Sequence, residues 1–360
     1  MNARAPRLFV SVSPHGLGHA AITAPVLNAA WAVMPELAVT VHSTVSRSWL
    51  DARLARPFAY TGRTRDFGMV MTSPTDIDVG ASAERYAALL ADWDDAVAEE
   101  RARIRASGAA LVVTSISFVT LAAARAEGVP AISLCPFDWA EVYGAYCADA
   151  KDARAVLDVM GDAYASAAAV LRPAPAVPSS RPGLHPIGPI AATGLARRDA
   201  LRRCVGAGPG ERVGLIAFGG IQSDASPQGW PRVPGWRWVL GQSMTVSRED
   251  MIASCRLDMP FIDIVSSVDV VVTKPGYGTF AEAACAGAAL LSMERPGWPE
   301  WPHMLDWLQG HVPAASVPAD RLRRGDIVAE LEMLAANDWR DPARPSGAEE
   351  AAMAILAYFA

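Results

Sequence analysis

Short β-branched runs alternate with longer segments of helical periodicity through the first half of the chain. Strand-like runs occupy residues 7–13, 37–43, 110–116 and 128–135. Segments with helix-compatible spacing lie between them, at residues 19–34, 46–55, 82–107 and 118–127. Such alternation is typical of a parallel sheet with helices on both faces.

A proline-rich run at residues 172–189 interrupts this pattern, and its composition cannot sustain a long helix. We interpret it as the last loop of a first domain, leading into a linker. The alternation then begins again, with predicted strands at 212–220, 236–242, 269–273 and 288–293 and a short helix at 261–268. Residues 346–360 have the spacing of an amphipathic helix.

The chain length also favours two domains, because 360 residues exceed the usual size of one hydrophobic core and 51% of them are apolar. The expected fold is α/β, with two Rossmann-like domains at residues 1–188 and 189–345 whose parallel sheets face a central cleft. A C-terminal helix at 346–360 could cross back to the N-terminal domain. Open parallel sheets bind ligands at the carboxyl ends of their strands, so we expect the functional residues there.

The charge and cysteine content narrow the class of partner. A net charge of −6 with interspersed signs argues against a nucleic-acid track or a polybasic membrane patch. Five cysteines without a C-x-x-C pair disfavour a disulfide framework or a zinc site and predict buried thiols in a reducing compartment. No apolar run reaches the ~18 residues that span a bilayer. We expect a cytoplasmic protein that binds small molecules, with peripheral membrane contact left open.

The stretch VVTKPGYGTFAEAACAG, residues 271–287, changes from a β-branched run to a small, helix-compatible segment. In the turn between them, Gly276 and Gly278 permit backbone conformations and close approaches that side chains would block. A helix is expected to start near Thr279, where unpaired N–H groups and the helix dipole favour an anion. Lys274 adds a positive charge, so this turn is a candidate phosphate site.

A structural interpretation of the same residues needs no ligand. Thr279 and Glu282 fit a capping box, in which the threonine caps the helix and the glutamate reaches back to the N–H of the cap. The glycines could be ordinary turn residues, and Lys274 could be a solvated loop charge. These residues alone do not decide between the two interpretations.

The first turn, SVSPHGLGHAA at residues 11–21, repeats the order of strand, glycine turn and helix, with Gly16 and Gly18 in the turn. The alanine at position 21 and the lack of an acidic residue after the second strand disfavour a nicotinamide cofactor. No P-loop motif is present. His15 and His19 are poorly placed to share a metal. A histidine here could be a hydrogen-bonded core residue, or a general base with a pKa near neutrality.

With both turns considered, the chain resembles the GT-B glycosyltransferases. GLGHA at residues 16–20 is similar to the glycine-rich first turn of MurG-type enzymes, with His19 on the histidine of that motif. Residues 261–287 follow the donor-binding segment of the superfamily along nearly their whole length. HGLGHA, CPFDWAEVYGAY, KPGYGTFAEAACAG and RPGWPEWPHML resemble more closely a predicted glycosyltransferase group that includes the N-terminal domain of plant L-arabinokinases.

This resemblance implies a nucleoside diphosphate sugar, UDP-linked or another, held mainly by the C-terminal domain, with no cofactor and no metal. The donor-binding residues that it implies are Gly219, Gly220, Phe261, Ile262, Lys274, Gly276, Tyr277, Gly278, Thr279, Glu282, Arg295 and Glu300. The amides of the 276–279 turn and the lysine before it would bind the pyrophosphate. Glu282 would bind the ribose hydroxyls, and residues 261–262 would border the base. The pair at 219–220 would approach the phosphates from the opposite side.

Sugar transfer needs a base for the acceptor hydroxyl and stabilisation of the departing diphosphate. No Asp-x-Asp metal motif is present, and the helix dipole, backbone amides and Lys274 can supply positive potential instead. His19 is the first candidate for the base, followed by His15 and Asp138. Asp138 follows a predicted strand, where it could line an acceptor pocket or cap the next helix.

In MERPGWPEWPHML, Arg295, Glu300 and His303 lie where the family places contacts to the donor sugar. Trp298 and Trp301 could stack on a sugar ring or anchor the loop. MurG-type enzymes carry a Gln-rich version of this loop, which this chain lacks, so the resemblance does not identify the donor sugar.

The loop GRTRDFG contains Arg63, Arg65 and Asp66, which could contact the acceptor or lie on an ordinary exposed loop. The favoured function is a metal-independent glycosyltransferase of the hexosyl or N-acetylhexosaminyl type. A nucleotide-sugar epimerase would use the same two-domain frame, with acid and base residues on both faces of the sugar. A non-catalytic nucleotide-sugar-binding protein is the third possibility. The sequence leaves donor, acceptor, stereochemistry and oligomeric state open.

Overall fold

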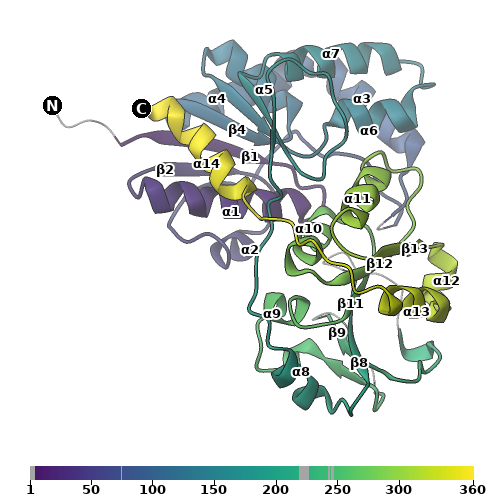
Figure 1. The fold of residues 1–360 in the computed structure, drawn as a ribbon. Coiled ribbons are helices and arrows are strands. Elements are labelled where there is room, and N and C mark those ends of the chain that lie inside the picture. Colours follow the sequence, from purple (N-terminus) through teal and green to yellow (C-terminus); the bar gives the residue numbers. More distant parts are fainter. Residues whose placement is uncertain (1–4, 74, 219–226, 242–243, 245–246) are drawn as a thin grey trace. The chain divides into compact units, whose positions relative to one another are not determined.

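The computed structural model describes residues 5–73, 75–218, 227–241, 244 and 247–360. The chain divides into two compact units, each an α/β unit built on one parallel sheet (Figure 1). The first unit comprises Met1–Ile190, Gly297–Glu300 and Ser346–Ala360, and the second comprises Ala191–Pro296 and Trp301–Pro345. The predicted α/β class with two parallel sheets is confirmed.

The first unit contains a seven-stranded sheet in the order β3-β2-β1-β4-β5-β6-β7, in which every pair is parallel. Its strands are β1 (Arg7–Val12), β2 (Ala38–His42), β3 (Ala59–Thr61), β4 (Leu111–Ser115), β5 (Ala131–Leu134), β6 (Ala169–Pro173) and β7 (Leu184–Ile187). Its helices are α1 (Gly18–Val33), α2 (Arg47–Asp51), α3 (Val79–Ala91), α4 (Trp93–Ser107), α5 (Phe118–Glu127), α6 (Trp139–Cys147), α7 (Ala153–Ala165) and α14 (Gly347–Leu356), which the short η3 (Ala357–Phe359) follows.

Two expectations for the first unit are wrong. The single helix expected over residues 82–107 is two helices, because the backbone leaves the helical region at Asp92, between α3 and α4. The proline-rich run expected to be a loop contains β7, which pairs with β6 at the edge of the sheet. An edge strand needs hydrogen bonds on one side only, so it can accommodate Pro186.

The second unit contains a six-stranded sheet in the order β10-β9-β8-β11-β12-β13, again with every pair parallel. Its strands are β8 (Arg212–Ala217), β9 (Trp236–Leu240), β10 (Met251–Ala253), β11 (Val270–Thr273), β12 (Ala289–Met293) and β13 (Ala314–Val317). Its helices are α8 (Arg198–Val205), α9 (Phe261–Val265), α10 (Tyr277–Ala286), α11 (Glu300–Gln309), α12 (Ala319–Arg324) and α13 (Val328–Ala336), with short η1 (Pro227–Gly229) and η2 (Ser254–Arg256).

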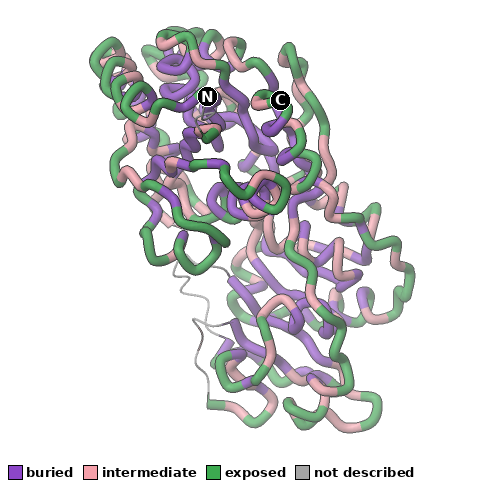
Figure 2. The backbone as a smooth tube through the Cα atoms, turned by 90° about the vertical axis from the view of Figure 1, so that its left-hand side faces the viewer, coloured by how far each residue is buried: buried purple, intermediate pink, exposed green. Residues whose placement is uncertain are grey.

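The central strands of each sheet form the buried centre of each unit (Figure 2). All four residues of β11 are buried, which explains the continuous β-branched run in the sequence. Packing is close at Gly214, where an added Cβ would lie 2.3 Å from the ring of Trp238. A glycine is therefore needed on β8 to accommodate the indole of the neighbouring strand.

The C-terminal helix α14 belongs to the first unit, where it packs against α1. Its start touches the chain that leaves β7, because an added Cβ at Gly347 would lie 1.9 Å from the carbonyl oxygen of Gly188. The expected return of the last helix to the N-terminal domain is confirmed.

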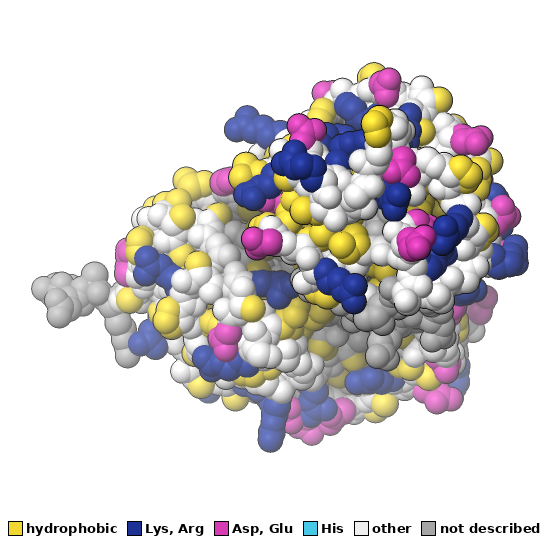
Figure 3. Space-filling view, turned by 90° about the horizontal axis from the view of Figure 1, so that it is seen from below, with side chains coloured by type: hydrophobic (Ala, Val, Ile, Leu, Met, Phe, Trp, Pro, Cys, Tyr) yellow, Lys and Arg dark blue, Asp and Glu magenta, His cyan; other side chains and the backbone are white. Residues whose placement is uncertain are grey.

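The surface charges and the cysteines agree only in part with the expectations from the sequence. Lys and Arg side chains are interspersed with Asp and Glu on the face shown in Figure 3. All five cysteines are free thiols, but Cys204 and Cys255 are exposed and Cys285 is partly exposed, so the expectation of buried thiols holds only for Cys135 and Cys147. Among the described helices, none combines the length and apolar character needed to cross a membrane.

Candidate functional site

The stretch 271–287 forms β11, a short turn and α10 in the second unit. The helix begins at Tyr277, a buried residue two positions before the expected start. Gly276 is the N-cap and makes no side-chain cap hydrogen bond. The N–H of Phe280 donates to the carbonyl of Gly276 at 3.2 Å, so the amides of Gly278 and Thr279 precede the hydrogen-bonded ladder. The capping-box interpretation, which started the helix at Thr279, is therefore wrong.

The two glycines of this turn have no special backbone conformation. Gly276 has φ −176°, an extended value that any residue adopts, and Gly278 has no positive φ. The expectation that they supply unusual dihedrals is wrong. A Cβ added at either position would meet no atom of the described residues within 4 Å. Neither the backbone nor the packing of the described residues requires glycine here, and the turn leaves room for the close approach of another molecule.

Lys274 and Arg295 carry positive charge on the same edge of the second sheet. Lys274 follows β11 and Arg295 lies two residues after β12, and these strands are parallel neighbours. Burial, together with repulsion from Arg295, lowers the pKa of Lys274 to about 8. No carboxylate among the described residues counters these two effects at Lys274. Lys274 therefore places a positive charge beside the open turn.

Glu282 lies in the second turn of α10, and burial raises its pKa to about 7. Burial, together with repulsion from the same carboxylate, raises the pKa of the Cys285 thiol to about 11. No cationic group among the described residues offsets the burial of Glu282. Such a partly buried acid without a counter-charge is costly for stability, and it is the kind of group found at functional sites.

Phe261 and Ile262 open the short helix α9 and are partly exposed. Residues near the start of the second unit contact this helix. An added Cβ at Gly194 would lie 2.3 Å from the carbonyl oxygen of Ile262. Asp263 accepts the N–H of Leu195 at 2.9 Å and pairs with Arg197 at 3.0 Å. The expected contacts of Gly219 and Gly220 fall outside the described residues.

In the first unit, the turn after β1 contains His15 and Gly16, and α1 starts at Gly18. Gly16 has φ +70°, so the turn itself requires a glycine at this position. His15 lies edge-on to Trp139, with ring centroids 5.1 Å apart. The loop residue Gly68 is confined between these rings, because an added Cβ would lie 2.7 Å from each.

His19 is buried in the first turn of α1, with 4% of its surface exposed. Its Nδ1 lies 3.3 Å from the hydroxyl of Ser115 and 3.6 Å from the thiol of Cys135. Burial lowers the pKa of His19 to about 3, and repulsion from His15 contributes. No carboxylate contributes to the pKa shift of this imidazole, so nothing offsets the effect of burial.

Asp138 has a structural role in the first unit. It is the N-cap of α6 and forms a capping box with Glu141, in which the aspartate accepts the N–H of Glu141 at 3.0 Å. The buried carboxylate also pairs with Arg172 at 3.4 Å and with Arg181. The interpretation of Asp138 as a helix cap is confirmed, and these partners occupy the carboxylate that a base would need free.

The loop that follows β12 is shared between the units. Arg295 belongs to the second, whereas residues 297–300 belong to the first. Trp298 is buried, lies parallel to the His15 ring with centroids 6.1 Å apart, and donates to Glu300 at 3.3 Å. The burial of Trp298 supports its interpretation as a loop anchor. Trp301 and His303 are partly exposed residues of α11.

The GRTRDFG loop is not an ordinary exposed loop. Arg63 is exposed, but Arg65 pairs with Asp92 and Glu99, each at 2.8 Å. Asp66 is buried, and burial raises its pKa to about 6, while the nearby Ser13 hydroxyl and the backbone N–H groups of residues 67 and 68 oppose this rise.

Ser115 and Cys135 are the site residues that the sequence analysis missed as partners of His19. They end β4 and follow β5, and the sheet order places β1, β4 and β5 side by side. Their separations from His19 in the chain are 96 and 116 residues. Adjacent parallel strands bring their carboxyl ends together, so the sheet order is the signal that would have found them.

Comparison with protein-family models and with curated proteins finds no match. Solved structures do match. The glycosyltransferase of kitacinnamycin has a TM-score of 0.61 and 15% identity over 99% of this chain and 100% of that one. CalG4, the calicheamicin glycosyltransferase, has a TM-score of 0.61 and 15% identity over 99% and 95% of the two chains.

A UDP-glucosyltransferase from Polygonum tinctorium, described as capable of glucosylating indoxyl, has a TM-score of 0.59 and 15% identity over 99% of this chain and 94% of that one. The likeness spans both units in each of these comparisons. The chain therefore has the GT-B fold of these glycosyltransferases, as its sequence motifs led us to expect. The fold alone does not determine the activity, which depends on the residues of the site.

Proposed function

We propose that the protein is a glycosyltransferase that transfers a sugar from a nucleoside diphosphate sugar to an acceptor hydroxyl. The observation that carries the proposal is the open turn at Gly276 and Gly278. Both positions are glycine although neither the dihedral angles nor the described neighbours require it. The GT-B fold adds support, since the structures that share it are named as glycosyltransferases.

In this proposal the second unit binds the diphosphate. The amides of Gly278 and Thr279 would donate to phosphate oxygens at the positive end of α10. Lys274 and Arg295 would supply the charge that stabilises the departing diphosphate, without a metal ion. Glu282, as a carboxylate, would accept hydrogen bonds from the ribose hydroxyls, and this would offset the cost of its burial.

The first unit would bind the acceptor and remove its proton. His19 stays our candidate for the base because it lies where the first parallel strand ends and is neutral above a pKa of about 3, so its lone pair is available. Its low basicity means that proton transfer would have to occur as the hydroxyl attacks, when the acidity of that hydroxyl rises. His15 is the alternative, since it is the more exposed of the two imidazoles.

A second candidate, a nucleotide-sugar-binding protein without catalysis, is favoured by one observation. His19 is buried and has no carboxylate contributing to its pKa, so it is a weaker base than a histidine paired with an acid. The epimerase alternative has no such observation in its favour.

The experiment is a thermal-shift screen with nucleoside diphosphates and their sugars, with and without magnesium, followed by product detection. A ligand present at ~100 times its Kd should stabilise the protein by about 2.7 kcal/mol. UDP and UDP-glucose come first, because one structural neighbour was solved with UDP-glucose. Donor consumption that requires an acceptor supports transfer. Turnover without an acceptor would favour the epimerase, and binding without turnover would favour the non-catalytic candidate.

A further inference from the structure

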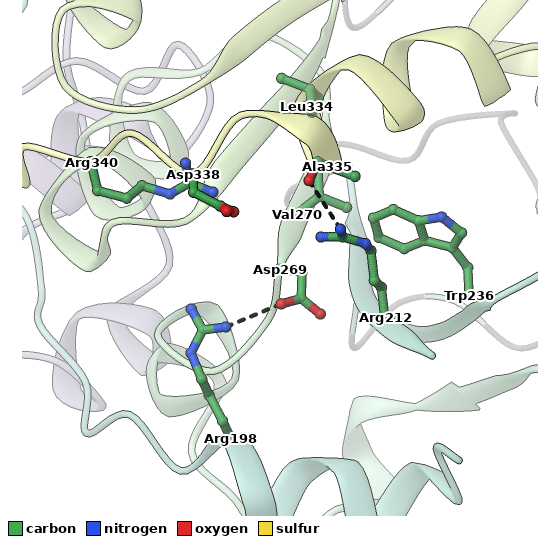
Figure 4. Close-up of a pocket in the computed structure, with 9 residues that line it drawn as sticks. All are labelled: Arg198, Arg212, Trp236, Asp269, Val270, Leu334, Ala335, Asp338 and Arg340. Atoms are coloured by element: carbon green, nitrogen blue, oxygen red, sulfur yellow. Dashed lines mark hydrogen bonds and ion pairs between the residues drawn. The ribbon is translucent and has the colours of Figure 1, made fainter. Parts of the chain in front are cut away.

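The second unit contains a polar cavity of about 220 Å³ at the amino ends of its central strands (Figure 4). Arg212 and Trp236 begin β8 and β9, and Val270 begins β11, so three neighbouring strands form its base. Leu334 and Ala335 of α13 line it from above, and Asp338 and Arg340 follow that helix. The candidate donor turn lies at the other end of β11.

Three guanidinium groups and two carboxylates line this cavity. Arg198 and Asp269 neutralise each other's charge, because Arg198 donates to Asp269 at 3.1 Å. The other oxygen of Asp269 accepts the N–H of Val213 at 2.8 Å, so each oxygen of this carboxylate has a partner. Asp338 is exposed and makes no ion pair among the described residues.

Among the described residues, the hydrogen-bond acceptors of the remaining two arginines are carbonyl groups. Arg212 donates to the carbonyl of Ala335 at 2.9 Å, and Arg340 donates to the carbonyl of Gly287 at 3.0 Å. Within the described ranges, neither guanidinium has a carboxylate at ion-pair distance. Carbonyl dipoles fix the orientation of a guanidinium but do not neutralise it, and both side chains are partly buried. Burial lowers the pKa of Arg340 and repulsion from Arg198 adds to that effect, whereas attraction to the carboxylates of Asp338 and Asp269 partly opposes it.

We propose that this cavity binds a small oxyanion, with a phosphoryl or carboxylate group held between Arg212 and Arg340. A guanidinium has five N–H donors in a planar fork that matches such groups, and each of these two keeps donors that the protein does not use. At about 30 Å³ per water molecule, the volume corresponds to roughly seven waters, which suits phosphate or a short carboxylic acid. This proposal does not depend on the function of the donor turn.

Isothermal titration calorimetry of the full chain with inorganic phosphate and with citrate tests it. Because the donor turn is itself a proposed phosphate site, each titration is repeated in Lys274→Ala. We expect saturable binding of at least one anion that persists in Lys274→Ala and weakens at least tenfold in Arg212→Gln and Arg340→Gln. Comparing the affinities of phosphate and citrate shows whether the cavity prefers a phosphoryl or a carboxylate group.

Two further variants make the result specific. Arg237→Gln removes an arginine of β9 that pairs with Glu211 outside the cavity lining, and it should leave binding unchanged. Asp338→Asn removes a negative charge from the lining on an exposed residue, so it should tighten binding about threefold at low salt without affecting the fold. Absence of saturable binding, loss of binding in Lys274→Ala alone, equal loss in Arg237→Gln, or no tightening in Asp338→Asn would each overturn the proposal.

Discussion

At the scale of single residues, the pKa of Glu282 helps to decide whether this residue has a structural role or a role in binding. It is far from the cap of α10, which is Gly276, and burial raises its pKa to about 7 from 4.5. The folded protein therefore retains this proton between about pH 4.5 and 7, and the associated stability is lost as the pH rises through 7. Keeping an acid at this position costs stability above neutrality, which a role in ligand binding would justify.

We predict that Glu282→Gln has a Tm equal to or above that of the wild type at pH 8, because the amide bears no buried charge. Nucleotide affinity should fall at least tenfold, since an amide is a weaker acceptor for two ribose hydroxyls. Differential scanning calorimetry and titration calorimetry measure the two quantities. A lower Tm with unchanged affinity would return Glu282 to a structural role.

His19 tests the catalytic half of the proposal. In His19→Ala, donor affinity should stay within a few-fold of the wild-type value, because the diphosphate is assigned to the other unit. Turnover should fall by roughly 10²- to 10⁴-fold, the usual contribution of a general base. His15→Ala is the matched control, and a larger loss in that variant would move the base to His15. Wild-type turnover in His19→Ala would exclude it as the base.

The pH profile provides a separate test of His19. Since burial holds its pKa at about 3, the imidazole is neutral through the physiological range. If it is the base in this environment, kcat should show no acidic decline near pH 6.5 from this group. A decline near 6.5 that disappears in His19→Ala would show that its pKa during turnover is that of a solvated imidazole.

At the scale of elements, the segment from Lys274 after β11 to Glu282 in α10 combines a cation and an acid with displaced pKa values. Glu282 has a pKa of about 7 and Lys274 one of about 8 in the free protein. A nucleoside diphosphate needs the carboxylate form of the first and the ammonium form of the second. The free protein holds both forms together best between these two values.

Donor affinity should therefore be highest between about pH 7 and 8 and should decline on both sides. Calorimetric titrations from pH 5.5 to 9.5 measure this profile. Glu282→Gln should abolish the acidic decline, and Lys274→Ala should abolish the alkaline one. A flat profile in the wild type would contradict both assignments.

Elements with local signals were predictable, and those that depend on distant partners were not. α5 runs from Phe118 to Glu127 as predicted, because Ser117 caps its start and Gly128, with φ +76°, ends it. The start of α10 was misplaced because its cap is a glycine with no side-chain signal. β7 was missed because its pairing with β6, and not its composition, makes it a strand.

In the candidate site, too, some features were predictable from local sequence and others depended on distant residues. The glycine turns and the lysine were recognisable from local sequence, since strand, glycine and helix follow within a few residues. The surroundings of His19 were not, because Ser115 and Cys135 come from other strands and because the burial that lowers the pKa of the imidazole arises from the fold. A motif can indicate which side chain lies at a sheet edge, but its pKa depends on what covers it.

At the scale of the molecule, the chain has the GT-B fold of the matched glycosyltransferases over 97% or more of its length, at 11–15% identity. The fold alone does not determine the reaction. The central claim is that the turn before α10 binds the diphosphate of the donor. Gly278 tests it best, because the described structure leaves room for a methyl group there and alanine favours a helix more than glycine does.

The decisive measurement is calorimetric titration of wild type and Gly278→Ala with the nucleoside diphosphate that stabilises the wild type most. The variant should have a Tm equal to or above that of the wild type, because alanine is favoured over glycine in a helix by about 0.8–1 kcal/mol. Its affinity should be at least tenfold weaker, since the added methyl group occupies the space that the phosphate needs. Equal affinity in the two proteins, or no binding of any nucleoside diphosphate by the wild type, would contradict the claim.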